Sequence, residues 1–288
     1  MNFGRVLTAM VTPFNVNGDI DYQKTAELIE YLLDHGTEGL VIAGTTGESP
    51  TLTKEEKISL LNHTIKTVNK RVPVIMGTGS NNTAASISLT KEAEACGADA
   101  IMLVAPYYNK PSQRGLYEHF SAIANESALP VMLYNIPGRS VVKMDADTIV
   151  QLSKVKNIVS VKEASGDLDL ISEVIERTSD DFTVYSGEDS MTLPLLAVGG
   201  DGVVSVASHV IGNEMQQMVG AFLNGDVKQA GALHRKLLPV MNGLFAAPSP
   251  SPVKAALRMK GVETGSVRLP LLELTDVEKQ QLQKILTV

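Results

Sequence analysis

The feature that most constrains this chain is an alternation of short apolar runs with longer segments of helical period. The apolar runs begin near residues 5, 38, 73, 99, 130, 157, 182 and 202, and each has the length of a buried strand. Between the runs, apolar side chains recur every three or four residues, as on one face of a helix. A strand followed by a helix, repeated eight times, predicts a (β/α)8 barrel, which typically takes ~250 residues in one domain.

The helical segments also carry signals for where they begin, end and pack. Thr53-Lys54-Glu55-Glu56 is a capping-box pattern, which predicts that a helix starts there. Three glycines are expected to end helices in the left-handed conformation, namely Gly36, Gly97 and Gly225. Two apolar stripes of helical period support two of these helices, Tyr22, Ala26, Ile29 and Leu33 in one and Ile58, Leu61, Ile65 and Val68 in the next.

The C-terminal part of the chain extends beyond what eight strand–helix units need. Residues from about 225 have helical period, with a break at Pro248-Ser249-Pro250-Ser251-Pro252. We therefore expect a barrel over residues 1–224 and a helical extension, residues 225–288, packed on it. A doubly wound open sheet also alternates strands with helices, and the period of the sequence alone does not exclude it.

Composition narrows the class of partner and the compartment. The 288 residues carry a net charge of −7, which argues against nucleic acid or an anionic membrane as the main partner. No apolar stretch approaches the ~20 residues of a membrane-spanning helix, and the first residues lack the regions of a signal peptide. The single cysteine, Cys96, excludes an internal disulfide, so we expect a reducing, cytoplasmic location. The five histidines show no ligand spacing, so no metal site is expected.

Lys162 occupies a position where a lysine is hard to explain by structure alone. It closes the apolar run Ile158-Val159-Ser160-Val161-Lys162, which predicts a short buried strand. Burying an ammonium group costs free energy unless the group is paired or takes part in chemistry. Because the reactive groups of a barrel lie at the C-terminal ends of its strands, we interpret Lys162 as a candidate nucleophile toward a carbonyl substrate.

Three other segments would converge on the same mouth of the barrel. Gly44-Thr45-Thr46-Gly47-Glu48 offers hydroxyls and backbone N–H groups to a carboxylate or phosphate, although glycines also serve tight connections. Tyr134 is either a core residue or a proton-transfer group, and Arg139 is either a carboxylate ligand or a solvated side chain. The aromatic pair Tyr107-Tyr108 is more typical of an interface than of catalysis.

One glycine-rich segment resembles a nucleotide site only in part. Gly77-Thr78-Gly79-Ser80-Asn81-Asn82 follows a predicted strand, as a dinucleotide-binding fingerprint does. Asn82 stands where the third glycine is needed, and no acidic partner is obvious at the right distance. We interpret the segment as a structural turn.

Taken together, three segments closely resemble the dihydrodipicolinate synthase family of Schiff-base (β/α)8 enzymes. These are Gly44-Thr45-Thr46-Gly47-Glu48, Tyr134-Asn135-Ile136-Pro137-Gly138-Arg139 and Val161-Lys162-Glu163-Ala164. Their order and spacing fit the family, and the similarity runs from Thr8-Ala9-Met10-Val11-Thr12-Pro13 to Arg268-Leu269-Pro270. The resemblance implies an enzyme of diaminopimelate and lysine biosynthesis that condenses pyruvate with L-aspartate 4-semialdehyde through a lysine Schiff base. It also implies that no external cofactor is needed.

The same resemblance implies catalytic roles and an assembly. Lys162 would condense with the ketone of pyruvate. Tyr134 would relay protons, linked to Thr45 and to Tyr108, the last supplied by a neighbouring subunit. The implied assembly is a cytoplasmic homotetramer built from two tight dimers.

Substrate-binding roles follow from the resemblance as well. Thr46 would hold the pyruvate carboxylate, with Gly187 and Val204 beside the same ligand. Arg139 would hold the carboxylate of the semialdehyde, which favours the synthase over the N-acetylneuraminate and 2-keto-3-deoxy sugar-acid lyases of the same family. A barrel that binds a keto acid without turnover is an alternative from another class.

One group of residues departs from the family pattern. Feedback-inhibited members bind lysine in a groove at the tight dimer interface, through histidine and glutamate side chains. The corresponding positions in this chain are Ser49, Lys54, Lys57, Asn81, Ala85 and Tyr107. Because the two lysines would repel the ammonium group of the ligand and the carboxylate that pairs with it is lost at Ala85, the sequence predicts weak or absent inhibition by lysine.

Overall fold

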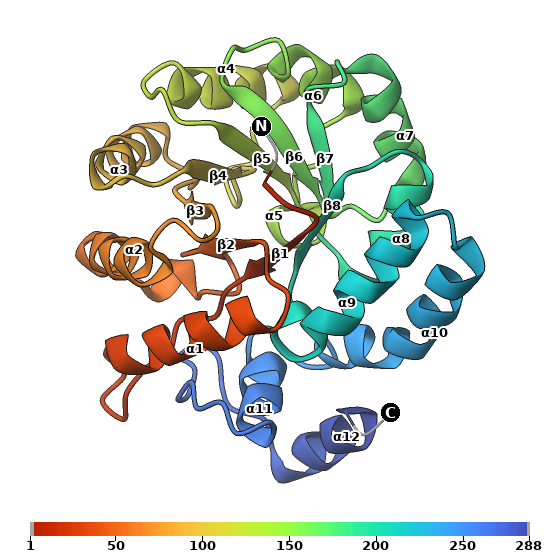
Figure 1. Cartoon of the computed structure of the whole chain (residues 1–288). Coiled ribbons are helices and arrows are strands. Elements are labelled where there is room, and N and C mark those ends of the chain that lie inside the picture. Colours follow the sequence, from red (N-terminus) through yellow and green to blue (C-terminus); the bar gives the residue numbers. More distant parts are fainter. Residues whose placement is uncertain (1–2, 287–288) are drawn as a thin grey trace.

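Eight parallel strands close into a barrel in the computed structural model, which describes residues 3–286 (Figure 1). The strands are β1 Val6–Ala9, β2 Gly39–Ile42, β3 Val74–Gly77, β4 Ala100–Val104, β5 Val131–Asn135, β6 Ile158–Glu163, β7 Thr183–Ser186 and β8 Gly202–Ser205. Each strand pairs with the next, and β8 closes the ring by pairing with β1. The predicted (β/α)8 barrel is confirmed, and the open doubly wound sheet is excluded.

Helices form a ring around the strands (Figure 1). Those between strands are α1 Tyr22–Asp34, α2 Lys54–Val68, α3 Thr83–Cys96, α4 Gln113–Ala124, α5 Pro137–Ser140, α6 Ala146–Leu152, α7 Leu168–Arg177 and α8 Thr192–Ala197. The predicted capping box starts α2, because the Thr53 hydroxyl accepts from the Glu56 N–H and the Glu56 carboxylate accepts from the Thr53 N–H. Gly36, Gly97 and Gly225 all have positive φ, as predicted.

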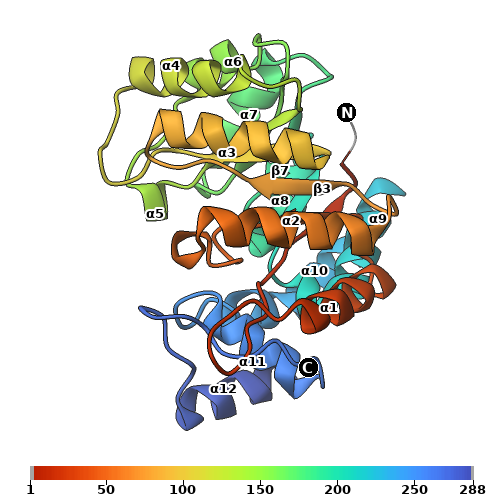
Figure 2. The same cartoon turned by 90° about the vertical axis from the view of Figure 1, so that its left-hand side faces the viewer.

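Up to residue 286, four helices follow the last strand: α9 Ser208–Leu223, α10 Val227–Gly243, α11 Ser251–Met259 and α12 Asp276–Leu286. α9 covers β1 and β8, and α10 packs on α9. α11 and α12 lie together beneath α1 and α10 in both views (Figures 1 and 2). The predicted break is present, since α10 ends at Gly243 and α11 begins within the proline segment at Ser251. Within residues 3–286, no helix is both long enough and apolar enough to cross a membrane.

The buried face of α1 coincides only in part with the apolar stripe seen in the sequence. The buried residues of α1 are Thr25, Leu28, Ile29 and Leu32. Tyr22, the first residue of the predicted stripe, is 38% exposed and lies against the ring of His63. This is because α1 carries two neighbouring apolar rows, and the contacts with α2 and α9 select the row through Leu28 and Leu32.

Two groups of apolar side chains fill the molecule. The larger one lies between the strands and the surrounding helices. The smaller one fills the barrel interior, from Phe3 and Leu7 at one end to Tyr134 and Ala164 near the carboxyl ends of the strands. The polar residues of the barrel mouth lie directly above this second cluster, which forms the floor of the mouth.

Candidate active site

A cavity of about 540 Å³ opens at the carboxyl ends of the strands. Residues that the sequence assigned to one site line it together, namely Thr45, Thr46, Tyr134, Arg139, Lys162 and Gly187. They come from the loop after β2, from β5 and β6, and from the turns after β5 and β7. The fold therefore gathers them at the end of a barrel where reactive groups are expected.

Lys162 lies on β6 beside Tyr134 of β5 and is only 5% exposed. Its Nζ atom lies over the Tyr134 ring, 4.1 Å from the ring centroid. Burial lowers the pKa of Lys162 to about 7, while the charge of Asp189 raises it and that of Arg139 lowers it. A large fraction of this lysine is therefore a neutral amine near pH 7, the form that attacks carbonyl carbons.

Asp189 is a site residue that the sequence analysis did not identify. It is 3% exposed, and its carboxylate accepts hydrogen bonds from the N–H groups of Val206 (3.1 Å) and Ala207 (2.9 Å) and from the Ser205 hydroxyl. Burial raises the pKa of Asp189, and these hydrogen bonds oppose the rise. The sequence signal was its place just after β7, but a polar turn after a strand has the same pattern.

Tyr134 is buried against Lys162 and belongs to the floor of the cavity. Burial raises its pKa to about 12, while the Arg139 charge and a hydrogen bond with Thr45 lower it. The phenol therefore keeps its proton at neutral pH. In that state it is able to donate a hydrogen bond to a nearby oxygen and to exchange protons through Thr45.

The loop that carries Thr45 and Thr46 is held from two sides. The Thr12 hydroxyl donates to the carbonyl oxygen of Gly47 over 2.7 Å. Glu48, in the left-handed region at φ 57°, lies 2.8 Å from the Lys254 Nζ atom, and both of these side chains are buried. The glycines of this loop therefore serve its tight packing, and the loop also presents two threonines to the cavity.

The Glu48 carboxylate also binds the C-terminal segment. It accepts a hydrogen bond of 2.8 Å from the N–H of Arg268. The Arg268 guanidinium and the Lys254 Nζ atom each lie 4.3 Å from the ring centroid of Phe14. These long-range partners were missed because they lie about two hundred residues away in the sequence.

There is no room for a side chain at Gly187, which lies beside Lys162. A Cβ atom at this position would lie 2.5 Å from the Ala164 Cβ and 3.1 Å from the Lys162 Cε. Val204, assigned to the same ligand by resemblance, is 1% exposed and packs inside the barrel. The cavity wall at that strand end is formed by Val206 instead.

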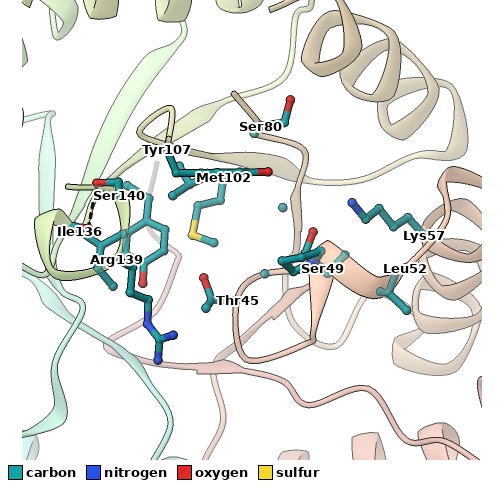
Figure 3. Close-up of a pocket in the computed structure, with 17 residues that line it drawn as sticks. Thr45, Ser49, Leu52, Lys57, Ser80, Met102, Tyr107, Ile136, Arg139 and Ser140 are labelled. Carbon is teal, nitrogen blue, oxygen red and sulfur yellow. Dashed lines mark hydrogen bonds between the residues drawn. The ribbon is translucent and has the colours of Figure 1, made fainter. Parts of the chain in front are cut away.

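A second cavity, of about 370 Å³, adjoins the first (Figure 3). The two share the wall formed by Thr45, Tyr134, Ile136 and Arg139. Three of the positions that correspond to the lysine-binding groove of feedback-inhibited members line the second cavity, namely Ser49, Lys57 and Tyr107.

The other groove positions lie outside this cavity. Lys54 forms an ion pair with Glu92 of α3. Asn81 donates to the Tyr107 carbonyl oxygen over 3.2 Å, and Ala85 is exposed near the start of α3.

Tyr108 lines neither cavity. It is 89% exposed, and its backbone is in the left-handed region at φ 73°. A bulky residue adopts that conformation at a cost of roughly 1–2 kcal/mol, and such strain is frequent at functional sites.

The histidines have structural surroundings. His209 is fully buried and accepts from the Val11 N–H over 3.2 Å, and burial lowers its pKa to about 4. His119 hydrogen-bonds the Thr83 hydroxyl at 2.9 Å. Among residues 3–286, no group of three or more His, Cys, Asp or Glu side chains is arranged to hold a metal ion.

Comparison with known proteins places this geometry in a family. The sequence pattern of the dihydrodipicolinate synthetase family matches residues 2–288. The chain belongs to this family. A 4-hydroxy-tetrahydrodipicolinate synthase 2 of Halalkalibacterium halodurans is 63% identical over 283 residues, which are 98% of this chain and 97% of that protein.

Solved structures of the family superimpose over almost the whole chain. A dihydrodipicolinate synthase from Bacillus anthracis is 60% identical with a TM-score of 0.98, covering 100% of this chain and 98% of that one. A chloride-inhibited dihydrodipicolinate synthase from Acinetobacter baumannii, solved in complex with pyruvate, is 39% identical with a TM-score of 0.96, covering 99% of this chain and 98% of that one.

Proposed function

We propose that this chain acts as a 4-hydroxy-tetrahydrodipicolinate synthase, which condenses pyruvate with L-aspartate 4-semialdehyde. The observation that carries the proposal is Lys162, a buried amine whose pKa is about 7, at the mouth of the barrel. Family relatives with full-length similarity bear this name, and one related structure contains pyruvate. No external cofactor is needed for the chemistry that follows.

The first half of the reaction forms an enamine. The neutral amine of Lys162 adds to the keto carbon of pyruvate, and water leaves to give a protonated imine. Thr46 binds the pyruvate carboxylate, and the narrow space at Gly187 places the ketone beside Lys162. The imine withdraws electrons, so the pyruvate methyl group loses a proton to give the enamine. Tyr134, hydrogen-bonded with Thr45, moves protons at these steps.

The second half joins the two substrates. The enamine carbon attacks the aldehyde carbon of the semialdehyde, and the new alkoxide takes a proton. Arg139, which lines the cavity beside Tyr134, binds the semialdehyde carboxylate through charge-assisted hydrogen bonds. The amine of the semialdehyde then attacks the imine carbon, closes the ring and releases Lys162.

The proposal includes the surroundings of the site. Residues 225–288 act as one unit with the barrel of residues 1–224, supported by Met241, Asn242, Phe245 and Ser249 in the cavity wall. We assign Tyr108 to the site of a neighbouring subunit in a homotetramer, supported by its strained backbone and 89% exposure. A cytoplasmic location suits a chain with a single, unpaired cysteine.

The proposal also includes weak or absent inhibition by lysine. Lys57 places a positive charge in the cavity that Ser49 and Tyr107 line, where the ammonium group of a bound lysine would be repelled. Half-inhibition by lysine at sub-millimolar concentration would contradict this part.

Reduction with borohydride in the presence of pyruvate, followed by mass spectrometry, tests the mechanism. A pyruvate-derived adduct on Lys162 is expected, and a Lys162→Ala variant should lose it while keeping its fold. Absence of the adduct from the unmodified protein would leave a keto-acid-binding barrel without turnover. Assays with aspartate semialdehyde, N-acetylneuraminate and 2-keto-3-deoxygluconate then separate the synthase from the family's sugar-acid lyases.

A further inference from the structure

Two buried polar side chains lie directly beside the central residues of the candidate active site. Asn135 ends β5 and Glu163 ends β6, and the two are paired across the strands one position beyond Tyr134 and Lys162. Asn135 is 0% exposed and Glu163 is 3% exposed. Because successive side chains of a strand point to opposite faces, Tyr134 lies in the barrel interior and the pair lies on the outer face. No step of the proposed mechanism uses this pair.

Both oxygens of the Glu163 carboxylate accept hydrogen bonds. The side-chain amide of Asn135 donates to Oε2 over 2.8 Å, and the N–H of Ser165 donates to Oε1 over 2.7 Å. An ionised carboxylate accepts hydrogen bonds and cannot donate them, so the NH2 end of Asn135 must face Glu163. This contact fixes the orientation of the Asn135 amide, whose Oδ1 atom then points the other way.

The oriented amide of Asn135 binds the far end of the turn that follows β5. Its Oδ1 atom accepts from the Met144 N–H over 3.0 Å, and its Nδ2 atom lies 3.2 Å from the Met144 carbonyl oxygen. The segment 136–143, which contains α5, therefore begins next to Asn135 and returns to it. Lys143 also pairs with Asp167, but both side chains are more than a third exposed, and exposed pairs contribute little. The buried contacts of Asn135 are therefore the main clamp on this turn.

Arg139 is carried by the clamped turn. It belongs to α5 and lines the catalytic cavity. Its guanidinium forms no hydrogen bond or ion pair with any residue in 3–286, so the backbone of the turn sets where this charge lies. The Ser140 hydroxyl donates to the Ile136 carbonyl oxygen over 2.9 Å, which tightens the turn from within (Figure 3).

We propose that Asn135 and Glu163 are positioning residues for the second substrate, because they hold the turn from which Arg139 binds the carboxylate of the aldehyde. The inference deepens the proposed function and rests on it for the identity of that substrate. Pyruvate is assigned to Lys162 and to Thr46, which lies on the loop after β2. A loosened pair should therefore raise the KM for the semialdehyde much more than the KM for pyruvate.

Two single variants and their combination test the pair in steady-state assays. Asn135→Asp sets a second carboxylate against Glu163, and Glu163→Gln sets an NH2 group where two donors converge, so each breaks the contact. Each should raise the KM for the semialdehyde about tenfold or more, with kcat and the KM for pyruvate changed less than about threefold. The double variant reverses the direction of the hydrogen bond and should recover part of the loss. Glu163→Asp, which keeps the charge on a shorter side chain, replaces Glu163→Gln if that variant folds poorly.

Asn157→Asp is the matched control. It is the same substitution next to the opposite end of β6, where the Asn157 amide binds the carbonyl oxygens of Ala124, Ser127 and Leu129. This variant should lower the urea unfolding midpoint and leave both KM values unchanged. A general loss of stability is thereby separated from the positioning of Arg139.

Hydrogen exchange measured by mass spectrometry tests the clamp without turnover. Peptides covering residues 136–144 should exchange faster in Asn135→Asp and in Glu163→Gln, and as in the unmodified protein in Asn157→Asp. Unchanged exchange in both single variants would overturn the inference, as would an equal rise of both KM values. Failure to trap pyruvate on Lys162 in the unmodified protein would instead overturn the proposed function, and the exchange data would still decide whether the pair holds the turn.

Discussion

In the proposed mechanism, Lys162 must lose its proton before it attacks a carbonyl, so its pKa would set the pH at which the protein reacts. Burial lowers that pKa to about 7 from an ordinary value of 10.5. The neutral fraction therefore rises as pH increases through about 7 and is nearly complete one to two units higher. We expect the initial rate of borohydride-trapped adduct formation with pyruvate to rise from about pH 6 to about pH 8 and then level off, as measured by mass spectrometry.

Two variants test the charges around Lys162 with opposite expected signs. Asp189→Asn removes a negative charge that raises the pKa of Lys162, so the midpoint of the pH profile should fall. Arg139→Gln removes a positive charge that lowers it, so the midpoint should rise. If both variants leave the midpoint unchanged, burial alone controls the lysine and the assigned roles of the two charges are wrong.

The role of the Tyr134 hydroxyl can be tested separately from that of its ring. Tyr134→Phe keeps the ring beside Lys162 but removes the proton relay, so kcat should fall by about 10²–10⁴-fold with little change in the midpoint for adduct formation. Steady-state assays of condensation measure this. Tyr185→Phe removes another buried hydroxyl, which donates to the Gly4 carbonyl oxygen over 2.9 Å, and should leave kcat nearly unchanged. Equal losses in both variants would point to general destabilisation.

At the scale of elements, the sequence predicted the strands well because a parallel barrel buries both faces of each strand. Such strands appear as short apolar runs, and their carboxyl ends place Tyr134 and Lys162 at one mouth. The ion pair of Glu48 with Lys254 was not predicted, because no local pattern joins residues so far apart. Asp189 was missed for a related reason, since its three hydrogen-bond donors lie at the end of β8 and just after it, whereas Asp189 itself follows β7.

The buried ion pair between the loop after β2 and α11 should be important for stability. Lys254→Met removes one partner and leaves the Glu48 carboxylate buried without its main counter-charge. Breaking such a pair typically costs about 3–5 kcal/mol. Urea unfolding should show a lower midpoint for this variant, and the KM for pyruvate should rise because Glu48 also holds the loop that carries Thr46.

An exposed ion pair provides the control. Lys91→Met breaks the pair with Glu126, whose side chains are about half exposed, and exposed pairs contribute at most about 1 kcal/mol. The double variant Glu48→Gln with Lys254→Met should recover part of the loss, because no buried charge remains. Similar unfolding midpoints for Lys254→Met and Lys91→Met would show that burial does not strengthen the first pair.

At the scale of the whole molecule, the active site depends on parts of the chain that are distant in sequence. The C-terminal extension was predicted from its helical period, but that period does not reveal which residues reach the cavity. Met241 and Asn242 near the end of α10, together with Phe245 and Ser249 beyond it, line the cavity. Their placement follows from the packing of α10 on α9 and on the segment around Asp189.

Tyr108 extends this dependence to a second copy of the chain. If it completes a neighbouring site, two inactive variants should restore each other when they assemble together. In a dimer of Tyr108→Phe with Lys162→Ala, the intact Lys162 of one subunit receives the intact Tyr108 of the other. Random pairing of equal amounts then gives about one quarter of the complete sites of the unmodified protein. Co-expression with two different affinity tags, followed by a condensation assay, measures the recovery.

Two controls show whether the recovered activity comes from mixed dimers of the two variants. Each variant assayed alone gives the background, because neither homodimer contains a complete site. Mixing after the purified proteins have been chemically cross-linked should give no recovery, since subunits cannot then exchange. Activity of co-expressed mixtures at the background level would place Tyr108 in the site of its own barrel or outside catalysis. Since its side chain is 89% exposed and lines neither cavity of its own barrel, we expect the recovery.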